Sequence, residues 1–263
     1  MVRTFGDGKE EVDDYAGGVI WKYEGIFIFK GKNKINMRTI DFVKLKEVLP
    51  RIPGILRKKE YFNAAVLIPL VWHNEEYHFL FEKRGAKIRQ GSEICFPGGE
   101  YDSGSDKSLL ETAIRETREE LGVKKERIKV IGKIDILVGN MGVTVDPFLA
   151  EIKIDTIDEL SPDKDEVEKV FLIPVSYFYE TPPETYFLKL EVHPFYTTMN
   201  GEKIDLFPAK ELELPEKYLN PWTAGKHKVF AWRTKEGTIW GITAALINEV
   251  ITKIKLSEEE IIK

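Results

Sequence analysis

The longest apolar run in the chain, residues 64–72, constrains the fold more than any other feature of the sequence. It reads AAVLIPLVW, includes Pro69, and is about half as long as the ~20 residues that a membrane-spanning helix needs. A second β-rich run, YHFLFEKR at residues 77–84, follows after a short polar turn, which indicates two paired strands. The first run is apolar enough to lie in the middle of a sheet that is covered on both faces.

The rest of the chain alternates between strand and helix patterns, which is typical of an α+β domain. We expect an N-terminal β-hairpin within residues 17–32, and a helix that begins at Thr39 and is stopped by Pro50. The later elements expected are a short strand and breaker at 94–99, a helix at 107–121 closed by Gly122, strands at 128–138 and 143–154, a short helix at 175–180, a hairpin at 228–233 and 238–240, and a final helix through residues 246–254.

These patterns predict two parts of unequal size. Residues 1–38 form an N-terminal extension, and residues 39–263 form one domain with a mixed sheet between helices. Within that domain, an acidic loop is expected at 155–168, and residues 181–225 are expected to be irregular with short strands because they hold several prolines and few clear periods. The added hairpin offers unpaired backbone groups, with which it would cover an edge strand or form the subunit contact of a homodimer.

Composition excludes several classes of protein. The chain has 263 residues, and its 39 Lys and Arg against 44 Asp and Glu give a formal charge of −5, which argues against a nucleic-acid or anionic-membrane partner. The only cysteine is Cys95, so no intrachain disulfide is possible and a reducing compartment, the cytoplasm, is expected. Residues 1–14 contain no apolar segment of a secretory signal.

The helix at 107–121 combines an apolar side with closely spaced carboxylates. The residues expected to pack on the sheet are Leu110, Ala113, Ile114, Thr117 and Leu121. Glu116, Glu119 and Glu120 stand at i, i+3 and i+4 on an adjoining face, where like charges repel one another. A solvated acidic face, tempered by Arg115 and Arg118, is the ordinary explanation for such a helix. A site for Mg²⁺ or Mn²⁺, which prefer oxygen ligands, explains the crowding as well.

The sequence around this helix resembles the Nudix box, commonly written G-x5-E-x7-R-E-U-x-E-E-x-G-U with U apolar. Gly98-Gly99 is followed by RETREELGV at residues 115–123, which matches the second half of the pattern closely. Two departures stand out: Thr117 replaces the apolar U, and the loop after Gly99 is longer than the pattern, with Ser105 where the first glutamate would stand. That first glutamate therefore has no assigned counterpart here.

The longer loop is similar to that of the coenzyme A diphosphatases within the Nudix superfamily. Residues 79–99, FLFEKRGAKIRQGSEICFPGG, resemble the upstream element of that subfamily, with Gln90 near the expected histidine and one residue missing. The resemblance extends over about residues 60–250. It implies a Nudix-like α/β/α sandwich with a mixed sheet, and metal-dependent hydrolysis of coenzyme A to 3′,5′-ADP and 4′-phosphopantetheine. Another nucleoside diphosphate derivative, such as ADP-ribose, NADH or a dinucleoside polyphosphate, and a non-catalytic nucleotide sensor are the alternatives.

The resemblance also implies roles for particular residues. Those assigned to Mg²⁺ or Mn²⁺ and to catalysis are Glu116, Glu119 and Glu120, with Glu166 assigned to catalysis alone. Those assigned to the nucleotide substrate are Arg84, Arg89, Gly98 and Gly99, with Arg115 as structural support. For Arg84 and Arg89 a plain surface position, and for Glu166 a solvated loop position, are equally open. The four histidines show no metal-ligand spacing, and Cys95, between two apolar residues, is expected to be a packing residue.

Overall fold

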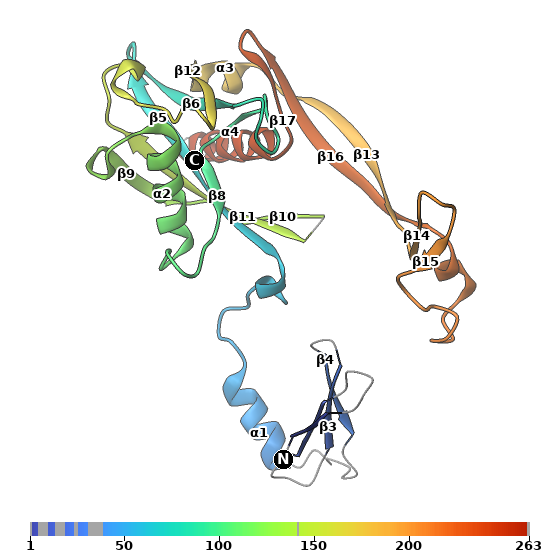
Figure 1. Ribbon diagram of the computed structural model, residues 1–263. Helices are drawn as coiled ribbons and strands as arrows, with labels where there is room; N and C mark the ends of the chain where they lie inside the picture. The colour runs from blue at the N-terminus through green and yellow to red at the C-terminus, as the bar shows by residue number, and fades with distance from the viewer. Residues whose placement is uncertain are drawn as a thin grey trace. The chain divides into compact units, whose positions relative to one another are not determined.

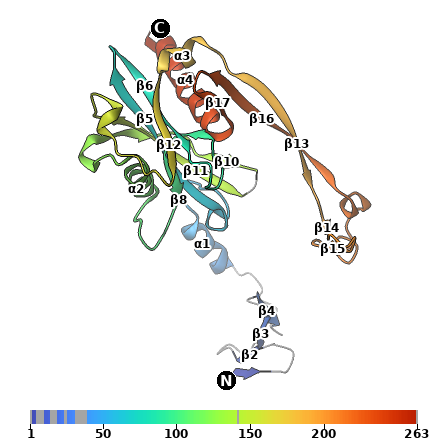
Figure 2. The ribbon, with the colours of Figure 1, turned by 45° about the horizontal axis from the view of Figure 1, so that its top comes forward.

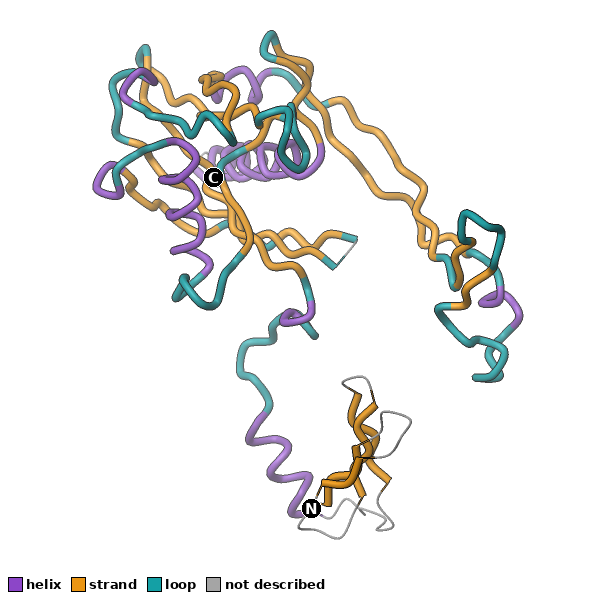
Figure 3. Tube along the Cα trace, in the orientation of Figure 1, coloured by secondary structure: helices purple, strands orange, loops and turns teal. Residues whose placement is uncertain are grey.

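The computed structural model describes residues 2–4, 10–13, 19–23, 26–30, 39–140 and 142–261. Contacts divide the chain into two compact units, Met1–Leu56 and Arg57–Lys263. The first unit contains a four-stranded antiparallel sheet, β1-β2-β3-β4, and one helix (Figures 1 and 3). Its elements are β1 (Val2–Thr4), β2 (Glu10–Asp13), β3 (Val19–Tyr23), β4 (Ile26–Lys30) and α1 (Thr39–Val48).

Strands β3 and β4 pair antiparallel, with Tyr23 opposite Ile26, which confirms the hairpin expected within residues 17–32. The expected helix from Thr39 is also present as α1. The contact division falls after Leu56, so α1 groups with the N-terminal strands, whereas the sequence patterns placed the boundary after residue 38.

The second unit is built on a mixed sheet of eight strands. Its main path runs in the order β10-β11-β5-β6-β12, and β7, β8 and β9 pair with β6, β5 and β11. The strands are β5 (Phe62–His73), β6 (Glu76–Arg84), β7 (Ile94–Cys95), β8 (Gly98–Glu100), β9 (Ile128–Lys133), β10 (Leu137–Gly139), β11 (Val143–Ile152) and β12 (Val167–Pro174). Strand β5 runs parallel to β11 and antiparallel to β6, so the apolar run is the central strand, as predicted.

Helices cover both faces of this sheet and complete the predicted α/β/α sandwich (Figures 1 and 2). Helix α2 (Leu109–Leu121) covers one face, and α3 (Val175–Glu180) and α4 (Gly241–Ile261) cover the other. Successive residues of a strand point to opposite faces, and β5 shows this directly. Leu67 packs in the core under α2, whereas Ile68 packs in the core under α4.

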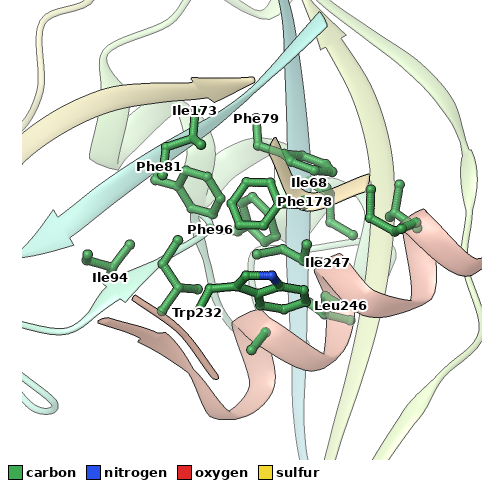
Figure 4. Close-up of a cluster of buried hydrophobic side chains, with 14 of the residues drawn as sticks. Ile68, Phe79, Phe81, Ile94, Phe96, Ile173, Phe178, Trp232, Leu246 and Ile247 are labelled. Atoms are coloured by element: carbon green, nitrogen blue, oxygen red, sulfur yellow. The ribbon is translucent and has the colours of Figure 1, made fainter. Parts of the chain in front are cut away.

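The core under α4 is rich in aromatic side chains (Figure 4). Phe81 stacks on Phe96 with ring centroids 4.8 Å apart, and Phe178 of α3 meets Trp232 edge to face. Fully burying one such side chain stabilises the fold by about 1.5 to 3 kcal/mol, so this cluster fixes α3 and α4 against the sheet. The Trp232 indole donates to the carbonyl oxygen of Thr181, so its polar atom is satisfied as well.

A long two-stranded ribbon leaves this body between α3 and α4 (Figure 3). Strand β13 (Glu184–Val192) pairs with β16 (Trp222–Thr234), which continues to β17 (Gly237–Trp240) as the expected hairpin. The short strands β14 (Phe195–Thr197) and β15 (Lys203–Asp205) lie between them in the sequence. The expectation of irregular structure with only short strands for residues 181–225 was therefore wrong for β13 and for the start of β16, and it is confirmed for residues 193–221. Eight of the nine residues of β13 are exposed, although residues 188–192, LKLEV, alternate apolar and polar residues as a strand does.

Two further expectations need adjustment. The strand expected at 128–138 is broken into β9 and β10, and the acidic loop expected at 155–168 ends earlier, because Val167 and Glu168 already belong to β12. Short 3₁₀ turns occur at Lys58–Glu60, Lys125–Arg127, Ile157–Glu159 and Glu216–Leu219. Among the described residues, none of the helices has the length and apolar character needed to cross a membrane.

Candidate active site

Helix α2 begins at Leu109, two residues later than expected, and ends at Leu121 as predicted. The Ser108 hydroxyl accepts a hydrogen bond from the Glu111 amide at 3.2 Å and caps the first turn. Gly122 ends the helix with φ 65° and its N–H bonds the Arg118 carbonyl. A Cβ at Gly122 would stand 2.2 Å from the Ser161 carbonyl oxygen, so glycine is needed for space as well as for conformation.

The buried side of α2 is rotated from the expected one. Ala113, Thr117 and Leu121 are buried as predicted, and the Thr117 hydroxyl satisfies itself by donating to the Ala113 carbonyl oxygen at 2.6 Å. Thr112 and Glu120 are buried too, whereas the expected Leu110 and Ile114 are only half-buried. Glu120 therefore points at the sheet and not into solvent.

The three carboxylates of α2 have different surroundings. Their side chains are 3% exposed at Glu120, 18% at Glu116 and 59% at Glu119. Glu120 accepts a hydrogen bond from the Gly98 amide at 2.9 Å. A Cβ at Gly99 would stand 2.3 Å from a carboxylate oxygen of Glu116, so a side chain there would displace that carboxylate. The two glycines of β8 thus form a cradle for the inner carboxylates.

Asp106 anchors Arg115, a role that the sequence analysis missed. The guanidinium donates to the Asp106 carboxylate through Nε at 2.9 Å and Nη2 at 3.0 Å. Its Nη1 lies 2.9 Å from Glu116 and 3.0 Å from Glu119. The hydrogen bonds from Arg115 hold the pKa of Asp106 at about 2. The signal in the sequence was an acidic residue directly after Ser105, one place beyond the position that the Nudix pattern gives to its first glutamate.

Glu82 of β6 is a second residue that the sequence analysis missed. Side chains alternate along β6, so that Phe79 and Phe81 enter the core under α4 while Leu80 and Glu82 face α2. The Glu82 side chain is only 1% exposed. The available signal was an acidic residue directly after the apolar residues FLF at 79–81.

Burial raises the pKa values of the inner carboxylates. It is the main reason why the pKa of Glu82 rises to about 7 and that of Glu120 to about 9, and the Glu82 charge adds to the rise at Glu120. The pKa of Glu116 is raised by burial as well, while Arg115 opposes the rise. The cluster therefore favours bound protons or a bound cation over free negative charge.

The two arginines before the glycines differ in position. Arg84 Nη1 lies 3.7 Å from Glu120 Oε1 and 3.9 Å from Glu82 Oε1, so one guanidinium faces both carboxylates. Arg84 Nε also donates to the Arg89 carbonyl oxygen at 3.3 Å. The Arg89 side chain is exposed on the loop after β6. The structure brings Arg84 into the cluster and leaves Arg89 at the surface.

Glu166, the residue before β12, and Glu168, within β12, interact with different groups. The Glu166 charge contributes to the raised pKa values of Glu82 and Glu116, so the Glu166 carboxylate lies within electrostatic reach of the cluster. Glu168 instead accepts a hydrogen bond from Lys83 Nζ at 2.6 Å. Cys95, expected to be a packing residue, is half-buried and donates from its thiol to Glu82 Oε1 at 3.4 Å, so it contacts the carboxylate cluster.

An open cavity of about 590 Å³ adjoins the cluster. Its lining comprises Glu100, Tyr101, Asp102, Ser105, Arg115, Glu116 and Glu119. Among the described residues, no three carboxylate, thiol or imidazole groups already stand as a finished metal-ligand set. The donor chemistry nevertheless fits a hard divalent cation, because all the donors are carboxylate oxygens and one of them, Glu82 Oε2, is buried without a hydrogen-bond partner.

Comparisons with known proteins show the family of the chain. The family model of the NUDIX domain matches residues 62–195. The uncharacterized Nudix hydrolase NudL of Pectobacterium atrosepticum is 28% identical over 203 residues, which is 77% of this chain and 88% of that protein. The peroxisomal coenzyme A diphosphatase NUDT7 of Mus musculus is 32% identical over 126 residues, 48% of this chain and 51% of that protein.

A further relative and a solved structure are similar to parts of the chain. The mitochondrial coenzyme A diphosphatase NUDT8 of Homo sapiens is 32% identical over 126 residues, which is 47% of this chain and 53% of that protein. The chain thus spans about half the length of these two diphosphatases. The crystal structure of RenU, a Nudix hydrolase from M. smegmatis, aligns with a TM-score of 0.38 and 18% identity, over 46% of this chain and 76% of that one.

Proposed function

The chain belongs to the Nudix family, and from that premise we propose that it is a metal-dependent diphosphatase that hydrolyses coenzyme A to 3′,5′-ADP and 4′-phosphopantetheine. That the protein is a Nudix hydrolase acting on a nucleoside diphosphate derivative follows from its family. The observation that carries the proposal is the carboxylate cluster of α2, cradled by Gly98 and Gly99 and faced by Arg84 from the upstream element.

Glu116 and Glu120 are the residues best placed to hold Mg²⁺ or Mn²⁺, with the exposed Glu119 as a third ligand from the same helix face. When bound, such a cation neutralises the negative charge of a diphosphate and lowers the pKa of bound water. Arg115 fixes the orientation of Glu116 and Glu119, and Asp106 fixes Arg115 in turn. This support keeps the outer carboxylates in place before substrate arrives.

Two further side chains would act on the substrate and on the nucleophile. Arg84, at the rim of the inner cluster, would bind phosphate oxygens, since a guanidinium matches their geometry with two hydrogen bonds. Glu166 is exposed and lies within electrostatic reach of Glu116, so it would accept a proton from the attacking water. Arg84 ends β6 and Glu166 directly precedes β12, and these paired strands place Val167 opposite Arg84.

Coenzyme A is proposed as the substrate for two reasons. The upstream element at residues 79–99 resembles that of coenzyme A diphosphatases, and two relatives about 30% identical carry that activity in their names. The intact acids at Glu116 and Glu120 speak against a non-catalytic sensor, which has no need to tolerate their repulsion. With one free cysteine and no disulfide, we propose the cytoplasm as the location.

A turnover screen tests the proposal. The purified protein is incubated with Mg²⁺ or Mn²⁺ and one of coenzyme A, oxidised coenzyme A, NADH, ADP-ribose or a dinucleoside polyphosphate, and products are identified by mass spectrometry. We expect 3′,5′-ADP and 4′-phosphopantetheine from coenzyme A at the highest kcat/KM. Efficient cleavage of ADP-ribose or a dinucleotide with no cleavage of coenzyme A would refute the substrate and keep the hydrolase. Absence of metal-dependent product from every substrate would favour the sensor.

A further inference from the structure

The buried carboxylate of Glu82 lies outside the Nudix box and has no role in the function proposed above. It comes from β6, a central part of the sheet, whereas the other inner carboxylates come from α2. Its side chain is 1% exposed, and its Oε2 has no hydrogen-bond partner. The other such oxygen in the described chain belongs to Asp146, which is ion-paired with Lys133. Glu82 is thus left with a buried, unsatisfied charge-bearing atom.

The neighbours of Glu82 do not account for this atom by packing alone. The Cys95 thiol donates to the other oxygen, Oε1, at 3.4 Å, and a thiol is a weak donor. Arg84 Nη1 is 3.9 Å from Oε1, which is too far for a hydrogen bond, and the same nitrogen is shared with Glu120 at 3.7 Å. Burying a carboxylate oxygen without a hydrogen-bond partner lowers the stability of the folded protein, so the presence of Glu82 at this position needs an explanation other than packing.

We propose that Glu82 is a ligand of the divalent cation, and that it joins Glu120 and Glu116 from the opposite wall of the site. The inference rests on the proposed function, in which this cluster holds Mg²⁺ or Mn²⁺. Glu82 and Glu120 both face Arg84 Nη1 within 4 Å, so their carboxylates converge on one region. An unpaired buried oxygen next to two further carboxylates is the donor set that a hard cation takes.

A ligand on β6 changes how the site is assembled. Three ligands on one helix are fixed relative to one another by the helix itself, whereas a ligand on the sheet binds the cation only when α2 is docked. Glu82 is held between Phe81 and Lys83 in a strand paired on both sides, with Cys95 of β7 and Val170 of β12 as its partners. Its position is therefore rigid, as a preformed ligand requires.

The competing role is that Glu82 only positions Arg84 for the substrate. Mn²⁺ affinity, measured by isothermal titration calorimetry on the full chain without substrate, separates the two roles. We compare the wild type with Glu82→Gln, Glu120→Gln and Arg84→Gln, and use Glu126→Gln, an exposed glutamate after α2, as the matched control. Circular dichroism and thermal unfolding confirm that each variant is folded.

We expect Glu82→Gln and Glu120→Gln each to weaken Mn²⁺ binding about tenfold or more. Glu126→Gln should leave the Mn²⁺ affinity unchanged, and Arg84→Gln should leave it unchanged or increase it. Wild-type affinity in Glu82→Gln with lost affinity in Glu120→Gln would overturn the inference and leave the proposed function standing. Unchanged Mn²⁺ affinity with the same raised KM for coenzyme A in Glu82→Gln and Arg84→Gln would overturn it in favour of positioning. Wild-type affinity in both Glu82→Gln and Glu120→Gln would overturn the metal assignment as a whole.

A second variant keeps the inference testable if Glu82→Gln does not fold. Glu82→Asp keeps the negative charge and withdraws the carboxylate by one methylene. If Glu82 is a ligand, the variant should bind Mn²⁺ more weakly; if Glu82 acts only as a nearby charge, the affinity should stay the same. We expect a measurable loss of affinity in Glu82→Asp that is smaller than that in Glu120→Gln. Wild-type affinity in Glu82→Asp would overturn the assignment of Glu82 as a ligand.

Discussion

Replacing Glu120 with glutamine should stabilise the metal-free protein while it abolishes the enzyme. In the native state burial raises the pKa of Glu120 from 4.5 to about 9, so at pH 7 the folded chain holds a proton that the unfolded chain has released. Stability therefore falls as the pH rises from about 4.5 towards 9. At 1.36 kcal/mol per pKa unit, the 2.5 units between 4.5 and 7 set an upper limit of about 3 kcal/mol on the cost at pH 7.

Glutamine removes this cost because it is never charged. Its amide oxygen can still accept the hydrogen bond from the Gly98 amide, so the net gain at pH 7 should be about 2 kcal/mol. Urea unfolding of the metal-free wild type and of Glu120→Gln between pH 5 and 9 measures it, with Glu126→Gln as the exposed control. Mn²⁺ should reverse the order, because only the wild type offers the carboxylate, and coenzyme A turnover by Glu120→Gln should be lost.

A Glu120→Gln variant that is less stable than the wild type at every pH would refute the reasoning about burial. Equal thermal shifts with Mn²⁺ and normal turnover in the variant would refute the assignment of this helix to the metal. The two results are independent, since the first concerns the fold without metal and the second the loaded site.

Three further predictions follow from the same geometry. Glu166→Gln should lower kcat for coenzyme A. Glu168→Gln should keep a kcat near that of the wild type, because the Glu168 carboxylate is bound by Lys83 at the surface. Equal kcat values for the two variants would indicate that both glutamates are solvated loop residues. Asp106→Asn should lower the free energy of unfolding by about 2 kcal/mol at pH 7, because the pKa of Asp106 in the folded protein lies below its ordinary value of 3.8. In the wild type this stabilisation is complete above about pH 4 and is lost as the pH falls through about 2. Acid unfolding of the wild type and of the variant measures the difference. Arg84→Ala should lower kcat/KM about 10- to 100-fold on coenzyme A and dephospho-coenzyme A alike, since it faces the carboxylate cluster, whereas Arg89→Ala should affect only the substrate with the 3′-phosphate; the reverse pattern would exchange the two roles.

The helices and strands were predictable from the sequence where the pattern of residues within a single element defines that element. The central strand β5, its hairpin partner β6 and the capped helix α2 each contain the pattern that defines them, so the sandwich followed from the sequence. The ribbon of β13 and β16 was not predicted, because most of β13 is exposed and its pairing partner lies 30 or more residues further along the chain. The alternation of apolar and polar residues in LKLEV, residues 188–192, was the available signal in the sequence.

The site was predictable in part for the same reason. Spacing on one helix identified Glu116 and Glu120, and the resemblance supplied Arg84, which the structure brings within 4 Å of Glu120. Glu82 was not predicted as part of the candidate site, because its place there depends on the residues of α2 that face it and not on its neighbours in the sequence. Glu119 shows the opposite limit, since helical spacing placed it with the others while its side chain is mostly exposed and bound to Arg115.

Asp106 shows how a departure from a family pattern can keep its physical purpose. The pattern expects a glutamate before the helix, and this chain has Ser105 at that place in a longer loop. An aspartate is one methylene shorter than a glutamate, but the additional loop residues bring Asp106 close enough for two hydrogen bonds to Arg115 at 2.9 and 3.0 Å. The loop is itself closed by Asp102, which accepts hydrogen bonds from the Gly104 amide and the Ser105 hydroxyl. What the site needs at this position is an anchored carboxylate beside the arginine, and loop length and side-chain length can be exchanged to provide it.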